Sequence, residues 1–135
     1  LGPITRKRNV KVLEHYMIKK RLKNKIIKIL ITHGDKIPDE SLLKEVSAIV
    51  IGHEHPAVSL RDASRVELFK CFLKGKYQGK YLIVQPSFNT IVEGTDVLKG
   101  DILSPFLQQN IDNFEVFVLE DKLYNFGKLK NLRIV

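Results

Sequence analysis

The sequence is poor in the residues that build thiolate or membrane sites. It has a single cysteine, Cys71, no tryptophan and no long apolar run. One cysteine excludes an internal disulfide and a thiolate zinc site, and it fits a reducing cytoplasm. Because Cys71 stands among Phe69, Phe72 and Leu73, we expect a buried core thiol rather than a reactive one. No segment has the roughly 20 apolar residues of a membrane-spanning helix, and no signal segment opens the chain. These absences favour a cytoplasmic protein without a membrane partner.

Acidic residues are also scarce. The 135 residues include 23 Lys and Arg against 15 Asp and Glu, for a formal net charge of +8 at pH 7. Ten of the basic residues fall within the first 30 positions, where Glu14 is the single acid. A basic stripe of this kind can contact the phosphates of nucleic acid. The simpler interpretation is that residues 19–25 form the solvated tip of a hairpin, and no nucleic-acid-binding motif accompanies them.

What is present is a globular, strand-rich pattern, with 44% hydrophobic and 28% charged residues. Between two strands, Pro38 and the acids that follow it, with Leu42, Leu43 and Val46 on one face, predict a short helix. We therefore expect a single partial domain over residues 1–135, of the α/β class, whose second half is a largely antiparallel run closed by a hairpin through residues 121–122. Apolar, β-branched runs predict strands at 9–18, 26–31, 48–51, 58–61, 66–73, 80–85, 113–120 and 122–126. The other predicted elements are the helix at 38–46, a helical turn at 104–109 and a structured loop at 86–96.

Two short histidine motifs follow buried strands: Thr32-His33-Gly34, and the run of residues 52–56, Gly-His-Glu-His-Pro. Ligand chemistry in an open α/β sheet gathers where strands end. His53 and His55, two positions apart in an extended segment, would point the same way. On the turn that ends the strand, both could reach an ion in a shared cavity, while Glu54 between them points elsewhere. His33 would complete a cluster of three. Neutral imidazoles are good ligands for Mn²⁺, Fe²⁺, Ni²⁺ or Zn²⁺. His15, flanked by Glu14 and Tyr16 on a strand, is expected to be an ordinary, partly buried residue.

The two histidine motifs resemble the last two metal motifs of calcineurin-like metallophosphoesterases, most closely the archaeal branch related to repair nucleases. The resemblance extends over nearly the whole chain, through residues 85–96, 104–107 and 124–127. It implies a four-layer α/β/β/α sandwich with two metal ions, Mn²⁺ being the first candidate, about 3.5–4 Å apart. His33 and His53 would bind one ion and His55 the other. A bridging water would then attack a phosphodiester substrate.

The earlier motifs of that family are missing from this sequence. Family members carry an Asp-x-His, a Gly-Asp and a Gly-Asn-His-Asp or Gly-Asn-His-Glu motif, which supply the carboxylate ligands and the histidine that assists the leaving group. The Gly34-Asp35 and Gly100-Asp101 pairs come too late in the chain to serve. Asp35 also stands where many relatives have a second histidine. The chain therefore looks like the carboxy-terminal half of such an enzyme. This half would need an amino-terminal half as its partner, and we assign no catalytic residue to it.

Charge supports the same expectation. Three neutral imidazoles cannot offset two dications about 4 Å apart, which repel strongly even at an effective dielectric near 20. We expect the isolated chain to be inactive. Two alternatives remain: a mononuclear zinc protein that uses His33, His53 and His55, and a non-enzymatic scaffold whose basic hairpin binds nucleic acid. An exposed sheet edge could also pair with a second copy of the chain.

Overall fold

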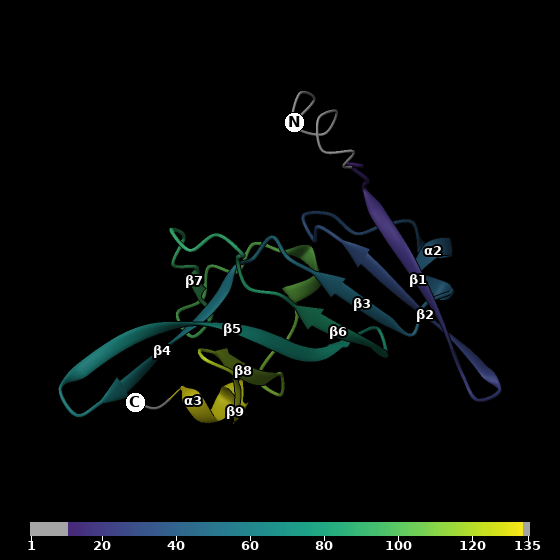
Figure 1. Cartoon of the computed structure of the whole chain (residues 1–135). Coiled ribbons are helices and arrows are strands. Elements are labelled where there is room, and N and C mark those ends of the chain that lie inside the picture. The colour runs from purple at the N-terminus through teal and green to yellow at the C-terminus, as the bar shows by residue number, and fades with distance from the viewer. Residues whose placement is uncertain (1–10, 134–135) are drawn as a thin grey trace.

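The computed structural model describes residues 11–133, and strands are its main secondary-structure element (Figure 1). No helix in this part of the chain is long and apolar enough to cross a membrane. The elements are β1 (His15–Leu22), β2 (Lys25–Thr32), α2 (Glu40–Lys44), β3 (Ala48–Ile51), β4 (Pro56–Asp62), β5 (Arg65–Tyr77), β6 (Lys80–Val84), β7 (Thr95–Asp96), the 3₁₀ helix η1 (Pro105–Leu107), β8 (Glu115–Leu119), β9 (Leu123–Lys128) and α3 (Leu129–Leu132).

The strands form one mixed sheet in the order β1-β2-β3-β6-β5-β4-β7, with β8 paired to β5 and β9 paired to β8. Three strands, β2, β3 and β6, run parallel, and α2 makes the crossover from β2 to β3. The long strand β5 pairs antiparallel with β4, β6 and β8 along successive parts of its length. A parallel strand–helix–strand unit followed by an antiparallel run agrees with the expected strand-rich α/β class.

The core lies on one face of this sheet. Leu30, Ile49 and Leu82 are register partners on β2, β3 and β6, and all three side chains are fully buried. Leu43 at the end of the crossover helix and Phe106 of η1 belong to the same core cluster. Burial of these apolar side chains is the main favourable term in the stability of the fold.

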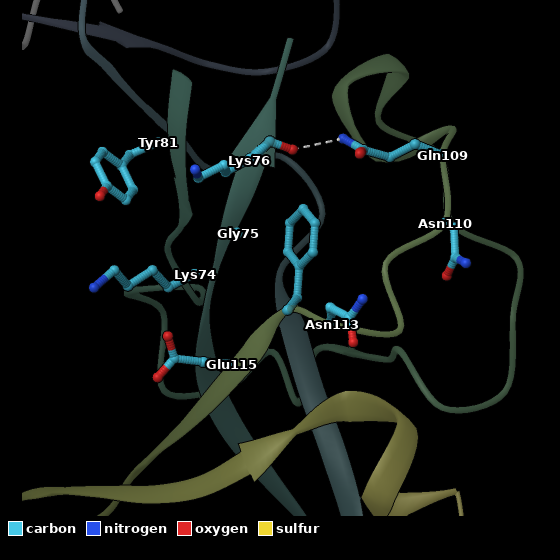
Figure 2. Close-up of a pocket in the computed structure, with 9 residues that line it drawn as sticks. Lys74, Gly75, Lys76, Tyr81, Gln109, Asn110, Asn113 and Glu115 are labelled. Atoms are coloured by element: carbon cyan, nitrogen blue, oxygen red, sulfur yellow. Dashed lines mark hydrogen bonds between the residues drawn. The ribbon is translucent and has the colours of Figure 1, made fainter. Parts of the chain in front are cut away.

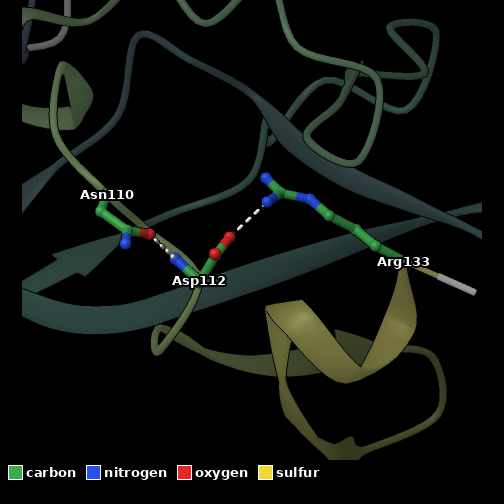
Figure 3. Close-up of polar contacts among 3 residues, drawn as sticks. All are labelled: Asn110, Asp112 and Arg133. Atoms are coloured by element: carbon green, nitrogen blue, oxygen red, sulfur yellow. Dashed lines mark hydrogen bonds and ion pairs between the residues drawn. The ribbon is translucent and has the colours of Figure 1, made fainter.

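The carboxy-terminal helix is held against the loop that precedes β8 (Figure 3). The Asn110 side chain accepts a hydrogen bond from the backbone N–H of Asp112, which shapes the turn. The carboxylate of Asp112 pairs with the guanidinium of Arg133, and its carbonyl accepts from the N–H of Lys130. These contacts fix α3 beneath the sheet, where Leu129 is fully buried.

Several element boundaries differ from the prediction. The first strand begins at His15 rather than at position 9, and positions 9 and 10 lie outside the described residues. The basic segment belongs to the paired strands β1 and β2, which continue as far as Leu22 and Lys25, so that the turn comprises Lys23 and Asn24 alone. Lys23 turns the chain with a positive φ of 55°. Strand pairing extends further than the hydrophobic pattern does, because lysine side chains on an exposed ladder leave the backbone hydrogen bonds intact.

The predicted helix at 38–46 is shorter in the structure. It covers Glu40–Lys44, preceded by Asp39, which makes no side-chain cap. Strand β4 begins at Pro56 rather than at position 58, and β5 runs on to Tyr77 rather than ending at position 73. The helical turn at 104–109 is a single turn of 3₁₀ helix, and the loop at 86–96 ends in the short strand β7. The hairpin through residues 121–122 is confirmed by the pairing of β8 with β9.

Candidate metal centre

The site is built at the carboxyl ends of two neighbouring parallel strands, β2 and β3. The backbone N–H of Gly52 donates to the carbonyl of His33 over 2.9 Å, which ties the two strand ends together. Gly34 follows with a φ of +104°, and a Cβ at that position would lie 2.9 Å from Cβ of Ile51. A glycine is therefore required here on two grounds, the left-handed backbone and the close packing of the turn on β3.

The structure brings His33 and His53 into direct contact. His33 Nε2 and His53 Nδ1 are 3.0 Å apart, and the two rings meet edge to face with centroids 4.9 Å apart. Without an ion, one nitrogen donates a hydrogen bond to the other. Two nitrogens each about 2.0–2.1 Å from one metal ion, at a right angle to each other, are also about 3 Å apart. The pair is therefore spaced as two neighbouring ligands of one ion would be.

The segment that carries His53 and His55 is not extended, contrary to the expectation from its i, i+2 spacing. His53 has a φ of 64° and His55 a φ of 52°, and the N–H of Glu54 donates to the carbonyl of Gly52 over 2.7 Å. Left-handed backbone at a non-glycine residue is uncommon and costs energy, which the surrounding contacts must offset. Such strain concentrates at functional sites, and here it turns the chain tightly between β3 and β4.

Glu54 anchors this turn from the inside. Its side chain is buried, with 2% exposed, and Oε1 accepts hydrogen bonds from the backbone N–H groups of Leu103 and Ser104 at 2.9 and 2.8 Å. The hydroxyl of Ser104 in turn donates to the carbonyl of Gly34 over 2.7 Å. The expectation that Glu54 points away from the histidines is confirmed. The network holds both histidine loops against the segment before η1.

Ser104 is a residue whose part in the site the sequence did not reveal. The Ser104-Pro105 pair predicts the start of a helical turn, and the Ser104 hydroxyl does accept from the N–H of Phe106 at 3.4 Å. Its second contact, to Gly34, spans 70 positions of the chain. A contact between residues so far apart in the chain has no signal in the local sequence pattern, so only the tertiary structure shows it.

The loop at 86–96 contacts the His55 backbone. The N–H of Thr95 donates to the carbonyl of His55 over 2.7 Å, and a Cβ on Gly94 would lie 2.6 Å from that same oxygen. At the other end of the loop, Lys70 Nζ donates to the carbonyls of Ser87 and Asn89. The loop is therefore a fixed cap that supports the His55 turn.

His55 itself is exposed, and the structure pairs it with neither of the other two histidines. Among residues 11–133, no group of three or more His, Cys, Asp or Glu side chains is arranged to hold an ion. The assignment of His55 as a ligand therefore stays a prediction. His15, on the edge strand β1, is exposed rather than partly buried, because β1 extends beyond the core.

Cys71 is fully buried in the core cluster, as expected. Burial is the main cause that raises the pKa of its thiol to about 12, and the nearby Asp96 carboxylate adds to the shift. The thiolate that would bind a metal or attack an electrophile is therefore suppressed. Cys71 takes no part in the candidate metal centre.

A cavity of about 510 Å³ lies elsewhere, beside the carboxy-terminal half of β5 (Figure 2). The side chains of Lys74, Lys76 and Tyr81 border it on one side, and Gln109, which donates to the carbonyl of Lys76 over 3.0 Å, borders it on the other. No histidine lines this cavity, so we do not assign it to the metal centre.

Comparison of the chain with protein-family models, with curated proteins and with solved structures gave no match.

Proposed function

We propose that this chain is the histidine-bearing portion of a metal-dependent phosphoesterase that hydrolyses phosphodiesters. The observation that carries the proposal is the 3.0 Å approach of His33 Nε2 to His53 Nδ1 at the ends of two parallel strands. In this proposal the two imidazoles hold one divalent ion, Mn²⁺ first, with Fe²⁺, Ni²⁺ or Zn²⁺ as alternatives. His55 serves a second ion, and the domain is one half of a four-layer sandwich.

The chemistry of the donor set says what else the site needs. Imidazoles orient a metal ion without neutralising it, so a pair of dications requires carboxylates from elsewhere. When bound, the ions would neutralise phosphoryl oxygens and lower the pKa of a water molecule. The residues of this chain would position them: Gly34 and Gly52 bring the two loops together, and Glu54 fixes the turn between the histidines.

Reconstitution tests the proposal. The 135-residue chain alone, with Mn²⁺ and bis(p-nitrophenyl) phosphate, is expected to give no turnover. Supplying an amino-terminal half that carries the missing carboxylate motifs, on the same chain or separately, should restore it. His53→Ala and His55→Ala should then abolish turnover, whereas His15→Ala, an exposed histidine on β1, serves as the matched control and should not.

Two results would contradict the proposal. Robust hydrolysis by the pure chain would show that no further carboxylates are needed. One zinc ion held tightly by the chain alone, and lost in His33→Ala, would favour the mononuclear zinc site. Metal analysis of the purified protein separates these outcomes before any activity is measured.

The projecting hairpin supports a second candidate function, nucleic-acid binding. Lys19, Lys20, Arg21, Lys23 and Lys25 are all exposed on β1, β2 and the turn between them. Such a cluster attracts phosphates by counterion release. Tight binding of DNA or RNA with a steep salt dependence, unchanged when the three histidines are replaced, would favour this function over hydrolysis.

A further inference from the structure

The cavity beside β5 is separate from the metal centre. Its volume of about 510 Å³ is in the range of cavities that bind small molecules, about 300–1,000 Å³. Tyr81, which lines it, is the register partner of Ala48, the first residue of β3. His53 comes after Ile51, the last residue of that strand. Tyr81 and the histidine pair are therefore at opposite ends of β3, and the cavity is a second candidate site.

Two cations and an aromatic ring form one wall of this cavity. Lys74 and Lys76 stand two positions apart on β5, so both side chains leave the same face of the strand. Their Nζ atoms are 5.8 and 5.5 Å from the centroid of the Tyr81 ring, and Tyr81 is 53% exposed (Figure 2). Within residues 11–133, neither ammonium group forms an ion pair with a carboxylate. A phosphate can therefore bind the two cations while a flat ring stacks on the tyrosine.

Glu115 adds an acidic side chain to the same wall (Figure 2). It is the register partner of Lys74 on β8, and it is half-buried. Two ammonium groups against one carboxylate leave this wall with a net positive charge. The carboxylate would repel a ligand that carries only phosphate. It can accept hydrogen bonds from hydroxyl groups, as acidic side chains do from the ribose of bound nucleotides. The wall thus suits a ligand with hydroxyl groups beside its phosphate.

The opposite wall carries three side-chain amides, from Gln109, Asn110 and Asn113 (Figure 2). Gln109 Nε2 donates to the carbonyls of Lys76 and Phe106 at 3.0 and 2.9 Å, so this side chain is held in position. Amide groups both donate and accept hydrogen bonds, as the edges of a nucleobase do. An aromatic ring, two cations, a carboxylate and amides together match the parts of a nucleotide.

We infer that this cavity binds a single nucleotide. The phosphate binds Lys74 and Lys76. The base stacks on Tyr81, and the ribose hydroxyls donate to Glu115. Inorganic phosphate would contact the lysines alone, so it should bind more weakly than a nucleotide does. The inference is independent of the proposed function, because no histidine lines the cavity.

Calorimetric titration of the chain with adenosine 5′-monophosphate tests the site, in EDTA so that no metal ion takes part. Saturable binding of one nucleotide per chain is expected. Tyr81→Ala, and separately Lys74→Gln combined with Lys76→Gln, should each weaken this binding at least about tenfold. Tyr124→Ala is the matched control, because Lys122 Nζ lies 5.3 Å from the centroid of that ring, outside the cavity. This control should leave the affinity unchanged.

The ribose contact has a test of its own. The wild-type chain should bind adenosine 5′-monophosphate at least about threefold more tightly than the 2′-deoxy nucleotide, because the 2′-hydroxyl donates to Glu115. Glu115→Ala should remove this preference, whereas Glu67→Ala, which replaces an exposed acid elsewhere on β5, should keep it. The same preference in both variants would overturn the ribose contact.

Absence of saturable binding would overturn the nucleotide site. So would inorganic phosphate that binds as tightly as the nucleotide and is unaffected by Tyr81→Ala. Loss of binding in His33→Ala would also overturn it, since the nucleotide would then be at the histidine pair. Displacement of the nucleotide by a single-stranded oligonucleotide, with a steep salt dependence, would indicate nucleic acid instead. Because Tyr81, Lys74 and Lys76 are exposed, their variants should fold, and thermal unfolding of each variant checks this.

Discussion

His33 and His53, twenty positions apart in the chain, meet edge to face with Nε2 of one ring 3.0 Å from Nδ1 of the other. Each histidine follows the end of a strand, and the two strands are parallel neighbours. The contact is thus a consequence of the sheet order. It places two potential metal ligands together at the edge where an open α/β sheet binds its ligands.

Metal affinity should depend on this pair. We expect His33→Ala or His53→Ala to weaken Zn²⁺ binding by the isolated chain at least about tenfold, because each removes one of two facing nitrogens. His15→Ala should leave the affinity unchanged. Competition with a chromophoric chelator measures the difference. Equal affinities for the three variants would show that the pair does not bind the ion.

Replacement of the buried carboxylate should destabilise the histidine turn. Glu54→Ala leaves the N–H groups of Leu103 and Ser104 without their acceptor, and we expect a loss of about 2–4 kcal/mol. Glu54→Gln keeps an acceptor oxygen but loses the charge, so that about 1 kcal/mol should be lost. Urea denaturation measures both. A smaller loss for Ala than for Gln would contradict the proposed anchoring.

Gly34 should tolerate no side chain. Gly34→Ala combines a left-handed φ with a Cβ 2.9 Å from Cβ of Ile51, and we expect a loss of about 2–4 kcal/mol. Gly127→Ala is the matched control, since its φ is +79° and nothing lies within 4 Å of its Cβ. It should cost about 1 kcal/mol, the backbone penalty alone. Similar losses in the two variants would show that close packing on Ile51 is unimportant.

The buried thiol should make stability fall at alkaline pH. Burial raises the pKa of Cys71 from 9.0 to about 12, so above pH 9 the unfolded chain loses a proton that the folded chain keeps. The folded state is therefore increasingly disfavoured as the pH rises from 9 towards 12. Cys71→Ala should show a shallower decline over that range, with other alkaline titrations common to both proteins. Parallel curves would exclude this contribution.

The two faces of β2 should respond differently to truncation. Leu30 is fully buried, so Leu30→Ala should lower the free energy of unfolding by about 2–5 kcal/mol, because a cavity forms in the core. Its neighbour Ile29 lies on the opposite face of β2 and is only half-buried, so Ile29→Ala should lower the free energy of unfolding by about 1 kcal/mol. Thermal unfolding of both variants checks this. Equal destabilisation by the two variants would mean that Ile29 is packed as tightly as Leu30.

Much of the fold could be predicted from local patterns. The β-branched runs located most strands, the run at 48–51 to the residue, and Pro38 with Leu43 and Val46 indicated the crossover helix. Boundaries were less well predicted where exposed lysines continue a strand, as in β1. The spacing of His53 and His55 suggested an extended segment and was wrong, because left-handed backbone at both residues turns the chain there.

The sequence by itself determined that the chain is strand-rich, that Cys71 is buried, and that three histidines follow two strands. These features depend on hydrophobicity and backbone preference, which act over a few residues. The tertiary structure alone decided that His33 touches His53, that the Ser104 hydroxyl donates to the carbonyl of Gly34, and that Ile31, Val50 and Ile83 from three neighbouring strands share one face of the sheet. Such contacts depend on the order and register of the strands, which are set by packing between residues far apart in the chain.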